Sequence, residues 1–206
     1  MAQTIARDSS TSANATFLVG TPASLTTIAV NEDGQGCLRQ TRINFFNTEI
    51  TVTDALAYAG LLLYTFPAGR VAIDGCVASL VFSVPLYNAA GTAVARTAGI
   101  NLNASLSWGF GSATASSITL ATTMIDMLPG SGQAVLTKTL SVADDGVNTA
   151  ATGALTAIPY QLDGTSTAAR LFFNLGFATN TDIDADGILR ISSGYVIVTW
   201  KYLGDY

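Results

Sequence analysis

An acidic loop near the carboxyl end holds the sharpest chemical pattern in the sequence. Asp182, Asp184 and Asp186 alternate with other residues and are followed by Gly187. Carboxylates at positions 1, 3 and 5 of a short loop can converge on one calcium ion. An EF-hand would place glutamate at position 12, but Ser193 stands there, and the flanking segments have strand patterns. A calcium site at the three aspartates therefore competes with a plain hairpin loop, in which Asp and Gly serve the turn, and we favour the loop.

Catalytic groups are scarce in the rest of the sequence. The chain contains no histidine, which removes Ser-His-Asp and Cys-His nucleophiles, most zinc sites and the commonest general base. Two cysteines cannot by themselves hold a zinc ion or an iron–sulfur cluster. A facing pair of carboxylates could still hydrolyse a glycoside, but turns already explain most of the aspartates. The sequence thus predicts a protein that is not an enzyme and that needs no cofactor.

The two cysteines, Cys37 and Cys76, are predicted to be free. Residues 1–14 contain no apolar core region of a secretory signal peptide, which indicates synthesis and folding in a reducing cytoplasm. Thiols stay reduced in that compartment. We therefore expect two free, buried thiols and no disulfide.

Four aromatic side chains allow a second kind of site. Trp108, Trp200, Tyr195 and Tyr202 could form a platform that stacks against sugars, as in lectin-like sandwiches. The two tryptophans, however, fall on the apolar faces of alternating segments, and such faces are buried in sheets. We predict that both tryptophans belong to the core, and the sugar platform is the alternative.

The elements that must carry these residues are strands, because apolar and polar side chains alternate over long stretches. In residues 100–108, Leu102, Leu106 and Trp108 share one face, while asparagine and serine fill the other. The same alternation predicts strands at 49–53, 77–84, 170–177 and 195–202. Weaker patterns predict strands at 16–20, 24–30, 41–46, 61–66, 134–142 and 155–162.

Turn chemistry separates the strands. Asp-Gly and Pro-Gly combinations favour tight turns because glycine accepts positive φ. Such turns are predicted at Asp33-Gly34, Asp74-Gly75, Asp145-Gly146, Asp163-Gly164, Asp186-Gly187, Pro67–Gly69 and Pro129-Gly130. Loops are expected at 88–99 and 141–155, and short helical turns at 54–60 and 122–128. So many antiparallel strands predict an all-β fold, an antiparallel β-sandwich of the jelly-roll type.

The chain divides into an arm and one domain. Residues 1–14 are small, polar and aperiodic, which predicts a flexible N-terminal arm that orders only against a neighbour. Residues 15–206 contain no linker and no long repeat. They are therefore expected to form a single β-sandwich domain.

Low charge is the strongest signal in the composition. Charged residues make up 11% of the chain, against about 25% in ordinary soluble domains. A charge-poor surface suits burial against identical neighbours, because a buried ion must be desolvated and paired. The net charge of −5 and the scattered cations disfavour nucleic acid as a partner. No apolar run approaches the roughly 18 residues of a membrane helix, so we expect no membrane partner. The low charge itself predicts a homo-oligomer.

The last third of the chain carries a pattern that resembles known proteins. An aromatic-rich strand at Leu171–Leu175 precedes the acidic hairpin, which is followed by Gly194–Trp200 and a closing Leu203-Gly204-Asp205. This pattern resembles small structural proteins of tailed-bacteriophage virions, in particular jelly-roll capsid decoration (cement) proteins. The resemblance implies a homotrimer on the capsid surface of the virion, bound to the major capsid protein after synthesis in the bacterial cytoplasm.

Three functions are open at this point. The first is a decoration protein that binds the outside of the phage head and bridges major capsid subunits. The second is a receptor-binding or lectin-like head of a phage fibre or spike, which exposed aromatic side chains and a calcium loop would favour. The third is a shell protein that encloses a genome, which ranks last because Arg7 is the only cation in the arm.

Overall fold

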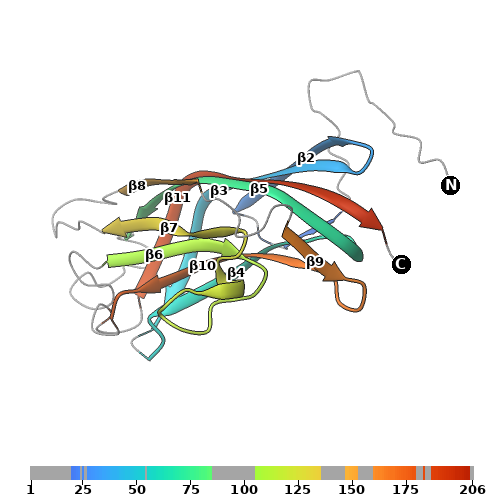
Figure 1. Cartoon of the computed structure of the whole chain (residues 1–206). Helices are drawn as coiled ribbons and strands as arrows, with labels where there is room; N and C mark the ends of the chain where they lie inside the picture. The colour runs from blue at the N-terminus through green and yellow to red at the C-terminus, as the bar shows by residue number, and fades with distance from the viewer. Residues whose placement is uncertain are drawn as a thin grey trace, which may run out of the picture.

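Two antiparallel sheets pack face to face, which confirms the predicted all-β, antiparallel β-sandwich (Figure 1). The structure is a computed structural model. It describes residues 20–23, 25, 27–53, 55–84, 105–135, 147–152, 160–179, 183 and 187–204. Within these residues the helical structure is one 3-10 turn, η1 (Thr122–Met124).

The two sheets are built from strands that are far apart in the sequence. Sheet A has the order β1 (Thr21–Pro22), β4 (Tyr58–Thr65), β10 (Arg170–Phe177), β6 (Ser105–Gly111) and β7 (Leu128–Val135). Sheet B has the order β2 (Ile28–Gln35), β3 (Leu38–Val52), β11 (Gly187–Gly204), β5 (Gly69–Ser83) and β8 (Val147–Thr152), and β9 (Tyr160–Gly164) also pairs with β5. The β2–β3, β6–β7 and β8–β9 connections stay within one sheet, and the other connections cross between the sheets.

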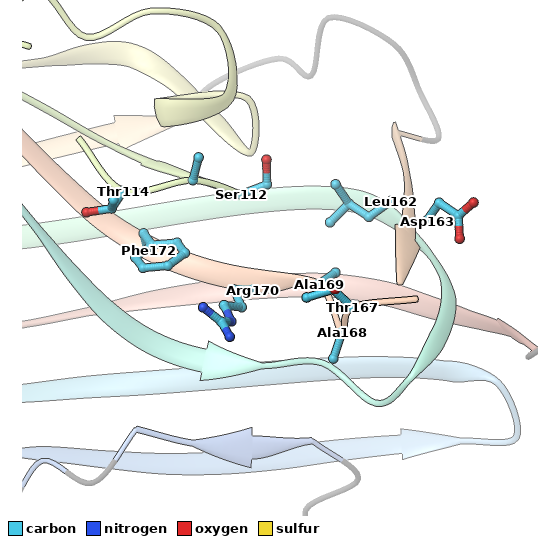
Figure 2. Close-up of a pocket in the computed structure, with 10 residues that line it drawn as sticks. Ser112, Thr114, Leu162, Asp163, Thr167, Ala168, Ala169, Arg170 and Phe172 are labelled. Carbon is cyan, nitrogen blue, oxygen red and sulfur yellow. The ribbon is translucent and has the colours of Figure 1, made fainter. Parts of the chain in front are cut away.

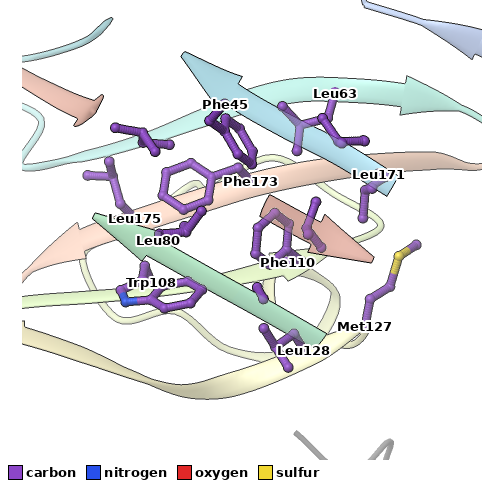
Figure 3. Packing of buried hydrophobic residues seen from close by; sticks show 14 of the residues in the cluster. Phe45, Leu63, Leu80, Trp108, Phe110, Met127, Leu128, Leu171, Phe173 and Leu175 are labelled. Atoms are coloured by element: carbon purple, nitrogen blue, oxygen red, sulfur yellow. The ribbon is translucent and has the colours of Figure 1, made fainter. Parts of the chain in front are cut away.

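The core lies between the sheets, where the predicted alternation places it. In β10 the inward side chains of Leu171, Phe173 and Leu175 are fully buried. Phe173 is surrounded by aromatic rings, with its centroid 6.5 Å from that of Phe45 and 5.5 Å from that of Phe110 (Figure 3). Burial of each such side chain stabilises the fold by about 1.5–3 kcal/mol.

The long strand β3 of sheet B changes, partway along its length, which of its side chains face the core. The segments predicted at 41–46 and 49–53 belong to one strand, β3. Alternate residues of β3 are buried up to Phe45, and alternation starts again at Thr48, so the buried side shifts by one residue. Asn47, which lies between them, has a φ of 51°. This change of side explains why sequence alternation divides one strand into two. It is not a bulge, because the pairing of β3 with β11 runs from Ile191–Thr48 to Ser193–Phe46 without a shift in register.

Three predicted turns lie inside strands instead. In the pairing of β5 with β11, Gly75 is opposite Thr199 and Ile73 is opposite Trp200, so that Asp74 is the extra residue of a bulge. Asp33-Gly34 lies within β2, and Pro129-Gly130 lies within β7 at an irregular pairing with β6. Glycine at these positions marks an irregularity in a strand, which sequence alone does not distinguish from a turn.

The other turn and strand predictions have mixed outcomes. Pro67–Gly69 connects β4 to β5, with a φ of 116° at Gly69, as predicted. The η1 turn lies within the predicted segment 122–128. The segment 54–60 instead contains the start of β4, and the loop expected at 141–155 contains β8. Outside the described residues lie 1–14, 16–19, 88–99, 101–104, 136–142 and Asp145-Gly146.

Residues 112–127, here called the covering loop, lie on the outer face of sheet A. The strands beneath carry glycine where the loop approaches. A Cβ on Gly176 would lie 2.2 Å from the carbonyl oxygen of Ile118, and one on Gly111 would lie 2.3 Å from that of Thr123. The loop backbone therefore rests directly on the sheet, at a distance that only glycine permits.

Asn174 fastens the covering loop to β10. Its Oδ1 accepts a hydrogen bond from the N–H of Ala115 at 2.7 Å. Its Nδ2 donates to the carbonyl oxygens of Ala113 at 2.8 Å and Met124 at 2.7 Å. The side chain is fully buried, although sequence alternation places it on the polar face of the strand. The covering loop is the reason, because it turns this outer face into a second interior.

Candidate functional site

The three aspartates of the possible calcium loop, Asp182, Asp184 and Asp186, lie outside the described residues. Between them Ile183 is buried in the core. Within the described part of the chain no three acidic or cysteine side chains gather in a group that could hold a metal ion. The calcium site therefore stays a prediction.

Both tryptophans are fully buried, which confirms their place in the core. Trp200 donates its indole N–H to the hydroxyl oxygen of Thr41 at 2.8 Å. The alternative prediction, a sugar-stacking platform, is therefore wrong for Trp108 and Trp200, which are not exposed to a ligand. Its two tyrosines have other contacts, since the Arg42 guanidinium lies 4.2 Å above the Tyr195 ring and the Tyr202 hydroxyl donates to the carbonyl oxygen of Ala68 at 2.9 Å.

The two cysteines are free, as predicted, but they differ in exposure. Cys76 is buried in β5, and burial raises the pKa of its thiol to about 12. Cys37 is exposed, so its predicted burial is wrong. It lies beside Gly36, which has a φ of 59°, in the two-residue connection between β2 and β3. A tight hairpin turn projects its residues into solvent, whatever their hydrophobicity.

A buried pair of polar side chains, which sequence analysis missed, joins the two sheets. The hydroxyl of Tyr64 in β4 donates to the Glu32 carboxylate in β2 at 2.5 Å and accepts the N–H of Gly20 at 2.8 Å. Burial, and then the adjacent carboxylate, raise the pKa of Tyr64 well above its usual range. The sequence contains a clue to this pair, because Glu32 alternates with Ile28 and Val30 and so lies on the same inward side of β2.

The Glu32–Tyr64 pair has a structural role. A carboxylate that points inward on β2, the last strand of its sheet, tolerates no shift in pairing. Displacing it would separate the carboxylate from the Tyr64 hydroxyl inside the sandwich. The pair therefore fixes the position of β2 in one sheet relative to β4 in the other.

A pocket of about 410 Å³ opens where the covering loop leaves sheet A (Figure 2). Its apolar wall includes the ring of Phe172 and the side chains of Leu162 and Ala169. The complete lining consists of Ser112, Ala113, Thr114, Leu162, Asp163, Thr167, Ala168, Ala169, Arg170 and Phe172. The pocket thus combines an aromatic surface with a rim of hydroxyl groups, one carboxylate and one guanidinium.

The two charged groups of the pocket come from different strands. Asp163 ends β9, where its Oδ1 accepts the hydroxyl of Thr165 at 2.7 Å and the N–H of Thr165 at 3.1 Å. These bonds hold the pKa of Asp163 below its usual range, which keeps the carboxylate ionised. Arg170 begins β10 and is exposed, and no carboxylate in the described part of the chain lies within ion-pair distance of it.

The outer face of sheet B presents a second surface, the sheet B face, made of Phe46, Val77, Val81, Tyr195 and Ile197. Phe46 is 55% exposed and Val77 is 40% exposed. Strand pairing places Tyr195 opposite Ser79, and Ile197 opposite Val77. Apolar side chains from β3, β5 and β11 therefore share this outer face with polar ones, since Asn44 lies opposite Tyr195 and Arg42 opposite Ile197.

Ion pairs on the same face are formed within the chain. Arg190 pairs with Glu49 across β11 and β3 at 2.9 Å. Lys201 pairs with Asp74 at 2.7 Å. The sheet B face therefore combines apolar side chains with the guanidinium of Arg42, which lies over the Tyr195 ring, and the two ion pairs flank it.

Comparisons with known protein families, with curated proteins and with solved structures find no match for this chain. No helix in the described residues is long and apolar enough to cross a membrane. The function must accordingly be argued from the two surfaces, the pocket and the sheet B face.

Proposed function

We propose that this protein is a non-enzymatic structural component of a tailed-bacteriophage virion, a capsid decoration protein that binds the outer surface of the head and bridges major capsid subunits. In this role it forms a homo-oligomer, a trimer by its resemblance to cement proteins. The observation that carries the proposal is the sheet B face, where exposed apolar side chains from three neighbouring strands lie among few charges.

Strand order supports a jelly roll, the fold of the proteins that the sequence resembles. Eight strands enter this comparison, with β1, β2 and β9 left aside, and they are numbered 1 to 8 from β3 to β11. They then lie in the order 1-8-3-6 in sheet B and 2-7-4-5 in sheet A. This is the order of two Greek keys wound into one sandwich.

The sheet B face is assigned to the contact between identical copies. Two copies of a chain with net charge −5 repel each other, so their contact must avoid unpaired charge. The flanking pairs Arg190–Glu49 and Lys201–Asp74 meet this condition. The Arg42 guanidinium lies over the Tyr195 ring, and a guanidinium placed over an aromatic ring is a cation that interfaces accept.

Oligomeric mass tests this assignment first. The purified chain is expected to run as a trimer by light scattering, and Phe46→Lys is expected to shift it to a monomer. Leu56→Lys is the matched control, because Leu56 is 50% exposed but lies in the β3–β4 connection. A monomeric parent chain, or equal effects of the two lysine variants, would contradict the assignment.

Capsid binding tests the function itself. Heads assembled without this protein are mixed with the purified chain and examined by electron microscopy and thermal unfolding. We expect saturable added density on the outer surface and a higher unfolding temperature of the shell. If the heads bind no protein and their stability stays unchanged, the decoration role is wrong.

A further inference from the structure

The covering loop contains a methionine at which oxidation would act on the fold. We propose that the thioether of Met124 is a site of reversible oxidation, and that its sulfoxide loosens the covering loop from sheet A. The chain has three methionines, of which Met1 lies outside the described residues. Met124, the last residue of η1, is half-buried, whereas Met127 is fully buried in the core. Met124 is therefore the more accessible of the two described thioethers.

The sulfur of Met124 joins the two limbs of the covering loop. The N–H of Ser116, on the first limb, donates a hydrogen bond to the Met124 Sδ at 3.4 Å, and the Ser116 hydroxyl donates to the same atom at 3.9 Å. Ser116 is exposed, so this contact lies at the surface of the protein. The lone pairs of a thioether accept these bonds only weakly, and they are also the electrons that an oxidant removes. Oxidation and the contact between the limbs therefore compete for the same atom.

The turn that carries Met124 depends on the contacts around it. Thr122 has a φ of 49°, which is an outlier for a β-branched residue. Such a conformation persists only where the surrounding structure determines it. Here the N–H of Met124 donates to the carbonyl oxygen of Ala121 at 3.1 Å, and the N–H of Ala113 donates to that of Thr123 at 3.0 Å. A change at the Met124 side chain thus acts on a turn that is strained before it is modified.

A hydroperoxide such as hydrogen peroxide is the co-reactant. The Met124 sulfur attacks one peroxide oxygen, the O–O bond breaks, an S–O bond forms, and water leaves after a proton is transferred. The sulfur loses two electrons and the peroxide gains them. The product is polar, with a partial positive charge on sulfur, so it no longer accepts the Ser116 N–H and favours water over a half-buried position. Sulfoxide reductases restore the thioether, which makes the change reversible.

The backbone of Met124 transmits the change to sheet A. Its carbonyl oxygen accepts a hydrogen bond from the Asn174 Nδ2 at 2.7 Å. Its carbonyl carbon lies 2.3 Å from the position that a Cβ on Gly111 would occupy. Displacement of Met124 therefore acts on contacts with β10 and with β6. We expect the outer face of sheet A to open, while the core between the sheets stays intact.

Treatment of the full-length protein with hydrogen peroxide tests the proposal, in a Cys37→Ser background that removes the exposed thiol. Peptide mass spectrometry follows each sulfoxide, and we expect Met124 to react at least about tenfold faster than the buried Met127. Hydrogen exchange of the Ala115 amide, which Asn174 holds, should become about tenfold faster. The urea midpoint should fall by about 0.5 M, as expected for the loss of one hydrogen bond. Methionine sulfoxide reductase should reverse both changes.

Two variants locate the effect at Met124. Met124→Leu keeps an apolar side chain of similar size that peroxide does not oxidise, so its urea midpoint and its Ala115 exchange should not respond to peroxide. Met127→Leu is the matched control, because it removes the neighbouring thioether and leaves Met124 in place. It should respond to peroxide as the parent chain does.

The proposal fails if Met127 is oxidised as fast as Met124. It also fails if complete oxidation of Met124 leaves the exchange of the Ala115 amide unchanged, or if it raises the urea midpoint. An equal response of Met124→Leu and the parent chain would place the effect of peroxide elsewhere and would likewise overturn it. The assays use the free protein, so their outcome is separate from oligomer formation and from capsid binding.

Discussion

The outer faces of the two sheets are built from different residues, and they meet different surroundings. On sheet A the outward positions near the covering loop are glycines and Asn174, and the chain itself covers them. On sheet B the outward positions are occupied by Phe46, Val77 and Ile197, and none of the described residues covers Phe46 or Val77. Where the chain covers its own sheet, the outward positions are glycines and one asparagine that bonds to the loop, and where a partner is proposed to cover the sheet they include large apolar side chains.

This difference implies that mutations on the two faces have different consequences. Substitutions on the outer face of sheet A should act on folding, because they disturb contacts within the chain. Substitutions on the outer face of sheet B should act on association. The following experiments test this division, beginning with the largest expected effect on stability.

Replacing Asn174 should be the most damaging change on sheet A. Asn174→Ala removes three hydrogen bonds and leaves the N–H of Ala115 and two carbonyl oxygens buried without these partners. We expect the free energy of unfolding to fall by about 3 kcal/mol, measured by urea denaturation. Asn44→Ala on the outer face of sheet B is the control, with an expected loss below about 0.5 kcal/mol. Similar losses of unfolding free energy in both variants would contradict the conclusion that Asn174 fastens the covering loop to β10.

A single methyl group at Gly176 should be the next most damaging change. The new Cβ of Gly176→Ala would lie 2.2 Å from the carbonyl oxygen of Ile118, so the covering loop must move. We expect a loss of about 2 kcal/mol in unfolding free energy. Gly75→Ala is the control, because nothing lies within 4 Å of the Cβ position there. If the two alanine variants unfold at the same urea concentration, the loop does not rest on Gly176.

Alkaline pH should weaken the contact that joins the sheets. The pKa of Tyr64 is raised in the folded protein, whereas an unfolded tyrosine ionises near 10.0. The unfolded chain therefore releases a proton that the folded chain retains, so this stabilisation is complete below pH 10 and is lost as the pH rises. We expect a decrease of about 1.4 kcal/mol per pH unit above pH 10.

The control for this pH effect is Tyr64→Phe, which cannot ionise at position 64. Its unfolding free energy should decrease less steeply above pH 10 than that of the parent chain. Urea denaturation at a series of alkaline pH values measures both slopes. Equal slopes would show that the Tyr64 hydroxyl does not retain its proton through the buried contact with Glu32.

The smallest effect on stability is expected on the sheet B face. Phe46→Lys replaces a side chain that is 55% exposed. We expect the unfolding free energy of the isolated monomer to change by less than about 0.5 kcal/mol, by thermal or urea denaturation at low concentration. A loss comparable to that of Asn174→Ala would mean that Phe46 belongs to the fold, and the division between the two faces would be wrong.

Sequence alternation predicts the strand faces well, because the period of two is a property of the local backbone. The fully buried residues of β10 follow it, and so do Trp108 and Trp200. It fails at Asn47, where the backbone adopts a φ of 51°, and at Asp74, which is the extra residue of a bulge. A bulge is defined only by its pairing with the opposite strand, so a single sequence does not reveal it. Glycine leads to wrong turn predictions for a similar reason, because its conformational freedom is used at bulges and close contacts as well as in turns.

The pocket beside Phe172 shows the same limit. Alternation places Arg170 and Phe172 together on one outward face of a strand. Nothing in the sequence places Asp163 or Ser112 in the lining of the same pocket, because those residues come from β9 and from the covering loop. A pocket depends on contacts between distant segments, and a single sequence does not encode such contacts in a local pattern.

The sequence by itself determined that this chain is an all-β protein with a core of alternating apolar residues, without histidine and with little charge. Composition and local periodicity suffice for these properties. Only the tertiary structure decided that Asn174 is buried, that Glu32 meets Tyr64 and that one sheet is covered while the other presents Phe46. These features arise when strands far apart in the chain pack together, and packing sets which of two outward faces becomes interior.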